Sequence, residues 1–250
     1  MKIKNILVSQ PKPVDIEKSP YGELTRKYNV NIDFHKFIKI EGIPAKEFRK
    51  ERINILDHSA VIFTSRNAVD HFFRICKEMR IEVPDTMKYF CISEATAFYL
   101  QKYVQYRKRK IFFGKQSIEQ LVDLVKKHKE EKFLLPCSEI HKQSISDQLE
   151  SNNINYQKAI IYKTLANDLS GIPISDYDML IFFSPSGVKS LFINFPEFKQ
   201  NSTLIGAFGA TTSKAVKDAG LVLNIEAPTK TAPSMTMAID QYIEKNSKKK

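Results

Sequence analysis

Short apolar runs alternate with amphipathic segments along most of the chain. After the run 60–63, Val69, Phe72, Phe73 and Cys76 fall at i, i+3, i+4 and i+7, which indicates one buried helical stripe. Buried strands that alternate with such helices are typical of parallel sheets with helices on both faces. We therefore expect an α/β fold, with strands at 5–9, 31–39, 60–63, 88–92, 111–113, 133–135, 156–162, 178–183, 203–208 and 221–225.

The strand–turn–helix pattern occurs twice. Three pairs of segments recur at separations of 116 to 119 positions, namely 61–69 with 180–188, 91–97 with 208–213, and 117–121 with 234–238. In each pair, a similar order of apolar and small polar residues leads into a similar helical stripe. One nearly constant separation indicates two related α/β domains, with a ligand held between their facing strand ends.

The number of strands makes the first domain discontinuous. The C-terminal part has too few strands for a sheet of its own, and it needs the N-terminal strand 5–9 to complete one. The prediction is two similar, flavodoxin-like parallel-sheet domains. Domain 1 comprises 1–37 with 169–250, domain 2 is the insert 44–162, and the crossings 38–43 and 163–168 form a two-stranded β hinge.

Small polar residues follow the strands at four repeated turns, 64–65, 93–96, 184–187 and 209–212. Ligands of open parallel sheets bind outside the carboxyl ends of the strands. The helix N-termini found there have unpaired N–H groups that attract carboxylates or phosphates. Helix capping alone explains any single turn, whereas several turns that face one cleft favour a shared anionic ligand.

The chain is basic, with a formal net charge of +11 over 250 residues. Part of that charge is in the segments 107–110 and 245–250, and a solvated surface is the simplest interpretation of both. A polyanionic small molecule and nucleic acid are the alternatives. The sequence has no nucleic-acid-binding motif, so we expect no nucleic-acid partner.

Targeting and redox features are few. No apolar run approaches the roughly 20 residues that span a bilayer, and the N-terminus has too short an apolar stretch for a signal peptide. We expect no membrane association. Cys76, Cys91 and Cys137 lie in apolar contexts without metal-ligand spacing, which predicts buried reduced thiols and a cytoplasmic protein.

Motifs for cofactors and metals are absent from the sequence. There is no GxGxxG, Walker A or GxSxG sequence, so no nucleotide cofactor or serine nucleophile is indicated. The histidines have no metal or triad partner at motif spacing; they are His35, His58, His71, His128 and His141. We expect neither a cofactor nor a metal.

The segment Phe182–Gly187, with the sequence FFSPSG, resembles the uroporphyrinogen-III synthase family. Further segments agree with that family in order and spacing, at 63–65, 95–97, 134–137, 161–164, 209–212 and 227–229. The resemblance spans nearly the whole chain, although each motif is short. It implies two α/β domains joined by a two-stranded ladder, with the first domain built from both termini.

The resemblance also implies a reaction. The family cyclises hydroxymethylbilane, a linear tetrapyrrole with eight carboxylates, in tetrapyrrole (heme) biosynthesis. The last ring, ring D, is inverted through a spiro intermediate with loss of water, giving uroporphyrinogen III without metal or organic cofactor. Spontaneous closure gives the uninverted isomer, so the enzyme acts mainly by positioning the substrate. We expect a monomer.

Residue roles follow from the resemblance. Tyr162 matches the candidate general acid, and interdomain packing is its alternative role. The expected substrate-binding residues are Thr64, Ser65, Arg66, Thr96, Ser184, Ser186, Gly187, Gly209, Thr211 and Thr212. One departure is Ser93–Glu94, where the family often has glycine before the Ala-Thr-Ala turn. Glu94 brings a negative charge close to a turn expected to meet carboxylates.

Two other functions compete with the synthase. A two-domain protein that closes on an anionic small molecule without catalysis would have the same cleft and the same helix N-termini. A nucleic-acid binder would account for the basic charge.

Overall fold

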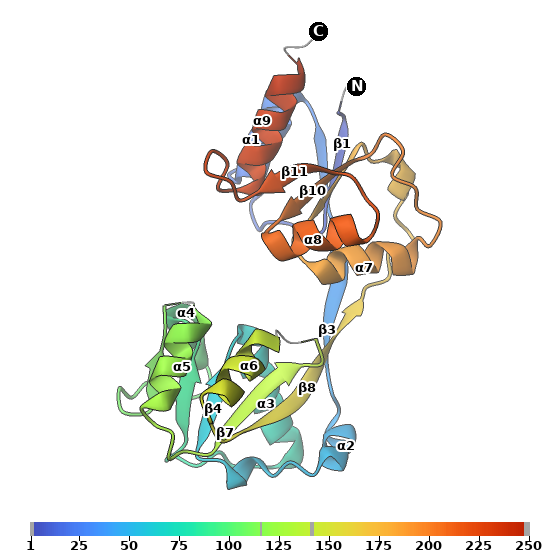
Figure 1. Ribbon diagram of the computed structural model, residues 1–250. Helices are drawn as coiled ribbons and strands as arrows, with labels where there is room; N and C mark the ends of the chain where they lie inside the picture. The colour runs from blue at the N-terminus through green and yellow to red at the C-terminus, as the bar shows by residue number, and fades with distance from the viewer. Residues whose placement is uncertain (1–2, 116, 141–142, 248–250) are drawn as a thin grey trace. The chain divides into compact units, whose positions relative to one another are not determined.

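The computed structural model describes residues 3–115, 117–140 and 143–247 (Figure 1). The chain divides into two compact units: unit 1 is Met1–Lys39 with Leu165–Lys250, and unit 2 is Ile40–Thr164. The chain therefore crosses from one unit to the other twice, once within β3 (Ile38–Gly42) and once within β8 (Tyr156–Ala166).

Unit 1 contains a parallel sheet in the order β11-β10-β9-β1-β2. Its strands are β1 (Asn5–Val8), β2 (Asn31–Phe34), β9 (Met179–Phe182), β10 (Leu204–Phe208) and β11 (Leu223–Ala227). Its helices are α1 (Pro20–Tyr28), α7 (Pro185–Asn194), α8 (Ala210–Asp218) and α9 (Met235–Ser247). Because β1 lies between β9 and β2, the sheet needs both ends of the chain, as the number of strands predicted.

Both faces of the unit 1 sheet are buried, since successive side chains of a strand point to opposite faces. Ile6 and Val8 of β1 pack with residues of α1 and α9, among them Leu24 and Ile239. Leu7 packs instead with residues of α7 and α8. The amphipathic stripes in the sequence are therefore the surfaces by which these helices cover the two faces.

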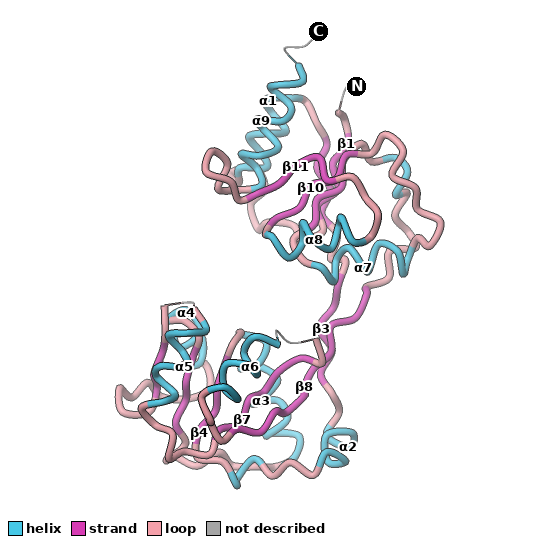
Figure 2. The backbone as a smooth tube through the Cα atoms, in the orientation of Figure 1, coloured by secondary structure: helices cyan, strands magenta, loops and turns pink. Residues whose placement is uncertain are grey.

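Unit 2 contains the second sheet, in the order β3-β8-β7-β4-β5-β6. Its remaining strands are β4 (Ala60–Phe63), β5 (Lys88–Cys91), β6 (Ile111–Phe113) and β7 (Phe133–Ser138), and β4 to β8 pair in parallel. Its helices are α2 (Ala45–Phe48), α3 (Arg66–Met79), α4 (Glu94–Leu100), α5 (Ile118–Lys126) and α6 (Gln143–Ser151). Residues of α3 and α4 pack on one face, and residues of α5 and α6 pack on the other. The α/β fold class is thus confirmed, with helices and strands alternating through two sheets whose strands are mostly parallel (Figure 2).

The strand expected at 31–39 is in fact two strands. Asn31–Phe34 pairs with β1 in parallel, whereas Ile38–Gly42 is the neighbour of β8. Phe37 lies between them with its side chain 1% exposed, and its carbonyl accepts hydrogen bonds from Asn167 N (2.9 Å) and Ser190 Oγ (2.5 Å). The alternation of apolar residues continues across this change of partner, so periodicity alone could not reveal it.

β3 and β8 run antiparallel. Asn167 N donates to Phe37 O, and Ile43 N donates to Ile161 O (3.0 Å), so one strand advances as the other recedes. β8 continues to Ala166 and includes most of the expected crossing 163–168. This ladder is the two-stranded β connection predicted from the sequence.

Capping residues mark several of the helix boundaries. Ser19 caps α1, with Pro20 at the first helical position, and Gly220 follows α8 with φ of +75°.

The last helix includes part of the basic C-terminal segment. α9 continues to Ser247, so the first half of the basic segment 245–250 is helical and its last three residues lie outside the described residues. His141 also lies outside them. Within the described part of the chain, no helix combines the length and the apolar character needed to cross a membrane.

Candidate functional site

The turns after β4 and β5 lie side by side, because these two strands are paired in parallel. Ser65 caps α3, and its Oγ accepts a hydrogen bond from Ala68 N (3.1 Å). Ser93 caps α4 in the same way, through Thr96 N (3.3 Å). Two helix N-termini therefore begin at the carboxyl edge of the unit 2 sheet, where an anion is stabilised by the unpaired N–H groups of each first turn.

A pocket of about 480 Å³ opens at this edge. It is lined by Thr64, Ser65, Ile92, Ser117, Ile118, Glu119, Leu135, Cys137, Ser138, Ile140, Ile145 and Tyr162. Tyr162 lies on β8 and is 8% exposed, with its hydroxyl 3.3 Å from Ser65 Oγ. The structure thus brings together Thr64, Ser65 and Tyr162, three of the residues expected from the sequence.

The environment of Tyr162 keeps its phenol protonated. Burial raises the pKa of Tyr162 above its usual value of 10.0, the hydrogen bond with Ser65 partly opposes this, and the nearby Cys137 raises the pKa further. A neutral phenol can donate a hydrogen bond or a proton to a leaving hydroxyl group. Tyr162 therefore carries the proton that a general acid needs, although its raised pKa makes it a weaker proton donor than a free phenol.

Two residues that sequence reasoning missed hold Tyr162 in place. The His71 ring stacks on the Tyr162 ring, with centroids 5.1 Å apart. Arg74 Nε donates to His71 Nδ1 (3.1 Å), and Arg74 Nη2 donates to the carbonyls of Ile161 (3.1 Å) and Ile43 (2.9 Å). Both residues lie on α3, far from β8 in the sequence, and no local motif marks them as partners of that strand.

The protonation of His71 makes stability depend on pH. Burial lowers the pKa of His71 below its usual value of 6.5, and Arg74 lowers it further against the opposing effects of Asp70 and Glu78. The unfolded chain therefore binds the proton more readily, and stability falls as the pH drops through about 6.5 toward the folded pKa. The free energy of unfolding of the wild-type protein should be lower at about pH 5.5 than at about pH 7.5. We expect this decrease to be smaller in His71→Phe, as measured by urea denaturation at both pH values. His35→Phe, at an exposed position, is the control and should retain the whole difference.

The corresponding edge of unit 1 has the same design. Ser184 caps α7 and accepts from Gly187 N (3.1 Å), and Pro185 occupies the first turn. The neighbouring helix α8 is preceded by Gly209, which has φ of +89° and no side chain with which to cap the helix. Only glycine adopts this backbone conformation readily, which explains its presence at the turn.

The remaining predicted residues differ in exposure. Arg66 is exposed and lies over the Tyr99 ring (5.4 Å to the centroid), and Thr211 is also exposed. Thr96 and Thr212 are 5% and 1% exposed, and Thr96 Oγ1 is hydrogen-bonded to Ser93 Oγ (3.1 Å). These two threonine side chains therefore pack beneath the first turns of their helices. Glu94 is exposed at the start of α4.

Ser117 and Ser138 are pocket residues that the sequence did not single out as ligands. Ser117 caps α5 and accepts from Gln120 N (3.2 Å), and Ser138 Oγ accepts from Ile140 N (3.2 Å). Ser117 belongs to the third repeated pair, so its position at a helix start could have indicated it.

Of the other ionisable residues, Glu119 lines this pocket and is exposed, so it places a negative charge at the pocket. Cys76, Cys91 and Cys137 are free and buried, as predicted, and burial raises the pKa of Cys91 to about 12. In the described part of the chain, His128, Glu130 and Glu131 place possible metal-ligand atoms within 4.8 Å of one another, a proximity that motif spacing did not reveal. Lys88 forms an ion pair with Glu131 and would compete with a cation at this cluster.

Two sheets whose helices begin at the carboxyl ends of parallel strands define a doubly wound α/β protein with one such sheet in each unit. The family model for "Uroporphyrinogen-III synthase HemD" matches residues 19–237. Because this match covers most of the chain, the protein belongs to the uroporphyrinogen-III synthase family.

Two solved structures share the fold. The uroporphyrinogen-III synthetase of Helicobacter pylori is 18% identical with a TM-score of 0.63, and the match covers 97% of this chain and 99% of that one. A mutant uroporphyrinogen III synthase of the extremely thermophilic bacterium Thermus thermophilus is 13% identical with a TM-score of 0.59 and the same coverage. The search of curated protein sequences found no significant match.

Proposed function

We propose that the protein is an enzyme that cyclises hydroxymethylbilane to uroporphyrinogen III, with inversion of ring D and loss of water. The observation that supports this most directly is the Tyr162 hydroxyl, which lines a pocket at the carboxyl edge of a parallel sheet beside the capping residue Ser65. Family membership and this geometry agree, since the reaction needs an acid near a site that accepts carboxylates.

Each chemical step requires few catalytic groups from the protein. The hydroxymethyl oxygen leaves as water when Tyr162 donates a proton to it, which leaves an electrophilic azafulvenium cation and a phenolate. The proton that the pyrrole releases when the ring closes restores the phenol. The last pyrrole attacks through its substituted carbon, and the spiro intermediate then fragments and recloses with that ring inverted. The protein must hold the one folded conformer that permits this attack, so positioning supplies most of the rate enhancement.

The carboxylates of the substrate are proposed to bind at the helix N-termini of both units. Exposed and half-buried groups would meet them directly: Thr64, Ser65, Arg66, Ser184, Ser186, Gly209 and Thr211. Thr96, Gly187 and Thr212 are buried in the described conformation, so we propose that they shape the first turns of α4, α7 and α8. Charge-assisted hydrogen bonds from N–H groups to carboxylates are among the stronger polar contacts in proteins.

The test of this function is an assay with hydroxymethylbilane, in which the products are oxidised and isomer III is resolved from isomer I. We expect isomer III to form much faster than isomer I forms spontaneously. If only isomer I appears, at the spontaneous rate, the proposal fails and the non-catalytic binding protein becomes the better hypothesis. A salt-dependent affinity for nucleic acid would favour the third hypothesis.

Ser65→Asp tests anion binding at the N-terminus of α3. Aspartate caps a helix as well as serine does, so the fold is retained, but its charge opposes a substrate carboxylate at this position. We expect KM to rise by roughly tenfold with little change in the free energy of unfolding. The matched control is Ser202→Asp, which adds the same charge at an exposed turn before β10. Equal KM values for the two variants would contradict the assignment of Ser65.

Three further properties complete the proposal. The three buried thiols are consistent with the reducing environment of the cytoplasm, and we propose that compartment. We also propose that the protein acts as a monomer. The boundaries 1–37 with 169–250 and 44–162 remain our prediction for the domains, with 38–43 and 163–168 as the hinge.

A further inference from the structure

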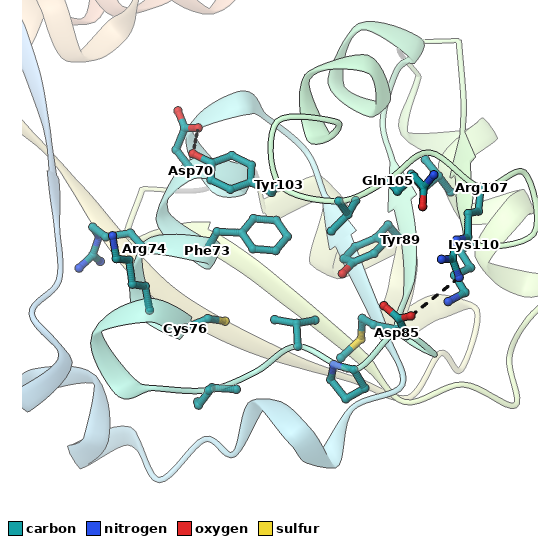
Figure 3. A pocket seen from close by; sticks show the side chains of 17 residues that line it. Asp70, Phe73, Arg74, Cys76, Asp85, Tyr89, Tyr103, Gln105, Arg107 and Lys110 are labelled. Atoms are coloured by element: carbon teal, nitrogen blue, oxygen red, sulfur yellow. Dashed lines mark hydrogen bonds and ion pairs between the residues drawn. The ribbon is translucent and has the colours of Figure 1, made fainter.

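A second pocket, of about 690 Å³, lies in unit 2 at the amino ends of β5 and β6 (Figure 3). It is formed by α3, by the segment that precedes β5, and by the segment between α4 and β6. It shares no lining residue with the Tyr162 pocket. Its volume is in the range of pockets that bind small molecules, and its walls determine which ligand it would accept.

The inner wall is apolar and largely aromatic. Phe73 lies against Tyr103, with parallel rings whose centroids are 4.5 Å apart. The centroid of the Tyr89 ring is 6.5 Å from that of the Phe73 ring. Met87 and Ile111, both buried, complete this wall. Such a surface favours a flat ring system, because aromatic groups gain from stacked and edge-to-face contacts as well as from burial.

Tyr89 provides an unused hydrogen-bond donor. Its side chain is 4% exposed, and its hydroxyl points inward among the lining side chains (Figure 3). Among the described residues we find no hydrogen-bond partner for this hydroxyl, although burial raises the pKa of Tyr89 and so keeps the donor protonated. Among the described residues, Ser213 Oγ is the buried side-chain atom without a partner, so the Tyr89 hydroxyl is reached by solvent from the pocket and can donate to a ligand there.

Charge around the pocket favours an anion. Lys77 and Lys110 line it, and neither forms an ion pair with a carboxylate among the residues that the structure describes. Arg107 is only loosely paired with Asp85, at 3.9 Å. The carboxylate of Asp70 already accepts hydrogen bonds from Tyr99 (2.8 Å) and Tyr103 (2.7 Å). The surplus of cations raises the local potential.

We propose that this pocket binds a small aromatic carboxylate. The ring system would lie against Phe73 and Tyr89, and the carboxylate would accept the hydrogen bond that Tyr89 does not otherwise make. The lysines at the mouth would select the anion over neutral analogues. The two pockets have no lining residue in common, although Arg74 lines this pocket and also donates to His71 and to the carbonyl of Ile161. The variants used below leave Arg74 in place, so they test this pocket separately from the synthase activity.

The probe for this site is 1-naphthoate, titrated into the full chain by heteronuclear NMR. We expect saturable shifts of the amide signals of Val83, Val104 and Lys110. The neutral analogue 1-naphthylmethanol should bind roughly tenfold more weakly. Tyr89→Phe keeps the ring and removes the hydroxyl, and we expect it to weaken naphthoate binding by roughly tenfold. The rate of isomer III formation should stay unchanged in this variant.

Two controls separate this pocket from binding elsewhere. Ser65→Ala alters the other pocket and should leave naphthoate affinity unchanged, whereas Val104→Trp should abolish binding by filling the site. Absence of saturable shifts in the wild-type protein would overturn the proposal, and so would equal affinity of wild-type and Tyr89→Phe proteins. Shifts confined to residues outside the pocket would overturn it as well, and that readout requires no variant to fold.

Discussion

Tyr162→Phe is expected to lower kcat for isomer III formation by roughly 100-fold while KM changes little. The substitution removes the one group that would donate the proton to the leaving hydroxyl, and general acid catalysis contributes about 10²- to 10⁴-fold in rate. The phenylalanine ring preserves the stack on His71 and the packing on β8. The measurement is steady-state kinetics with hydroxymethylbilane, with the two isomers quantified separately.

Tyr156→Phe is the matched control for this experiment. Tyr156 is at the start of the same strand, but its hydroxyl donates to the carboxylate of Glu150 (2.8 Å), which is not part of the pocket. Both variants lose one hydroxyl from β8, and the Tyr156 hydroxyl is hydrogen-bonded to Ser146 and Glu150, so the control removes at least as many hydrogen bonds without touching the pocket. If kcat is the same in both variants, Tyr162 is not the acid, although the synthase function would stand.

Phe63→Ala is expected to lower the free energy of unfolding by about 3 to 5 kcal/mol. The Phe63 side chain is 0% exposed, packs edge-on against Phe72 with ring centroids 5.5 Å apart, and stacks on Tyr89 at 6.0 Å. Truncation loses the transfer free energy of the ring and leaves a cavity that its neighbours fill only in part. Urea denaturation followed by circular dichroism measures the change.

The sequence repeat supplies a second variant for this test. Phe182 occupies the position equivalent to Phe63, is also 0% exposed, and packs edge-on against Phe37 at 5.7 Å. Phe182→Ala should therefore lower the free energy of unfolding by a similar amount, because it leaves a cavity in unit 1 as Phe63→Ala does in unit 2. Phe98 is 74% exposed, and Phe98→Ala should shift the midpoint little. If the urea denaturation midpoint of Phe63→Ala equals that of the wild-type protein, the two equivalent positions are not both core positions.

Most of the secondary structure could be predicted because it depends on local signals. The stripe at Val69, Phe72 and Cys76 has helical spacing, and capping serines such as Ser65 and Ser184 precede their helices in sequence as well as in space. The prediction of a single strand at 31–39 was wrong because the tertiary structure determines which strand lies beside another. Alternation of apolar residues is the same whether β1 or β8 lies alongside.

The candidate site was only partly predictable for the same reason. Ser65 and Tyr162 are 97 positions apart, and their contact depends on the order in which β4, β7 and β8 assemble. The resemblance to a known family indicated Tyr162, but no pattern indicated the His71 ring that stacks on it. Tyr89 was part of an expected strand, and only packing reveals that its hydroxyl lacks a partner among the described residues.

The sequence by itself determined the repeated α/β units, the helix starts that can bind anions, and the family. These features rest on hydrophobic periodicity and on capping, which act over a few residues. The tertiary structure alone decided which strand ends became neighbours, which threonines were buried beneath their turns, and which side chains brace Tyr162. Those outcomes depend on packing between segments far apart in the chain, and local sequence does not encode that packing in a form that can be recognised by pattern.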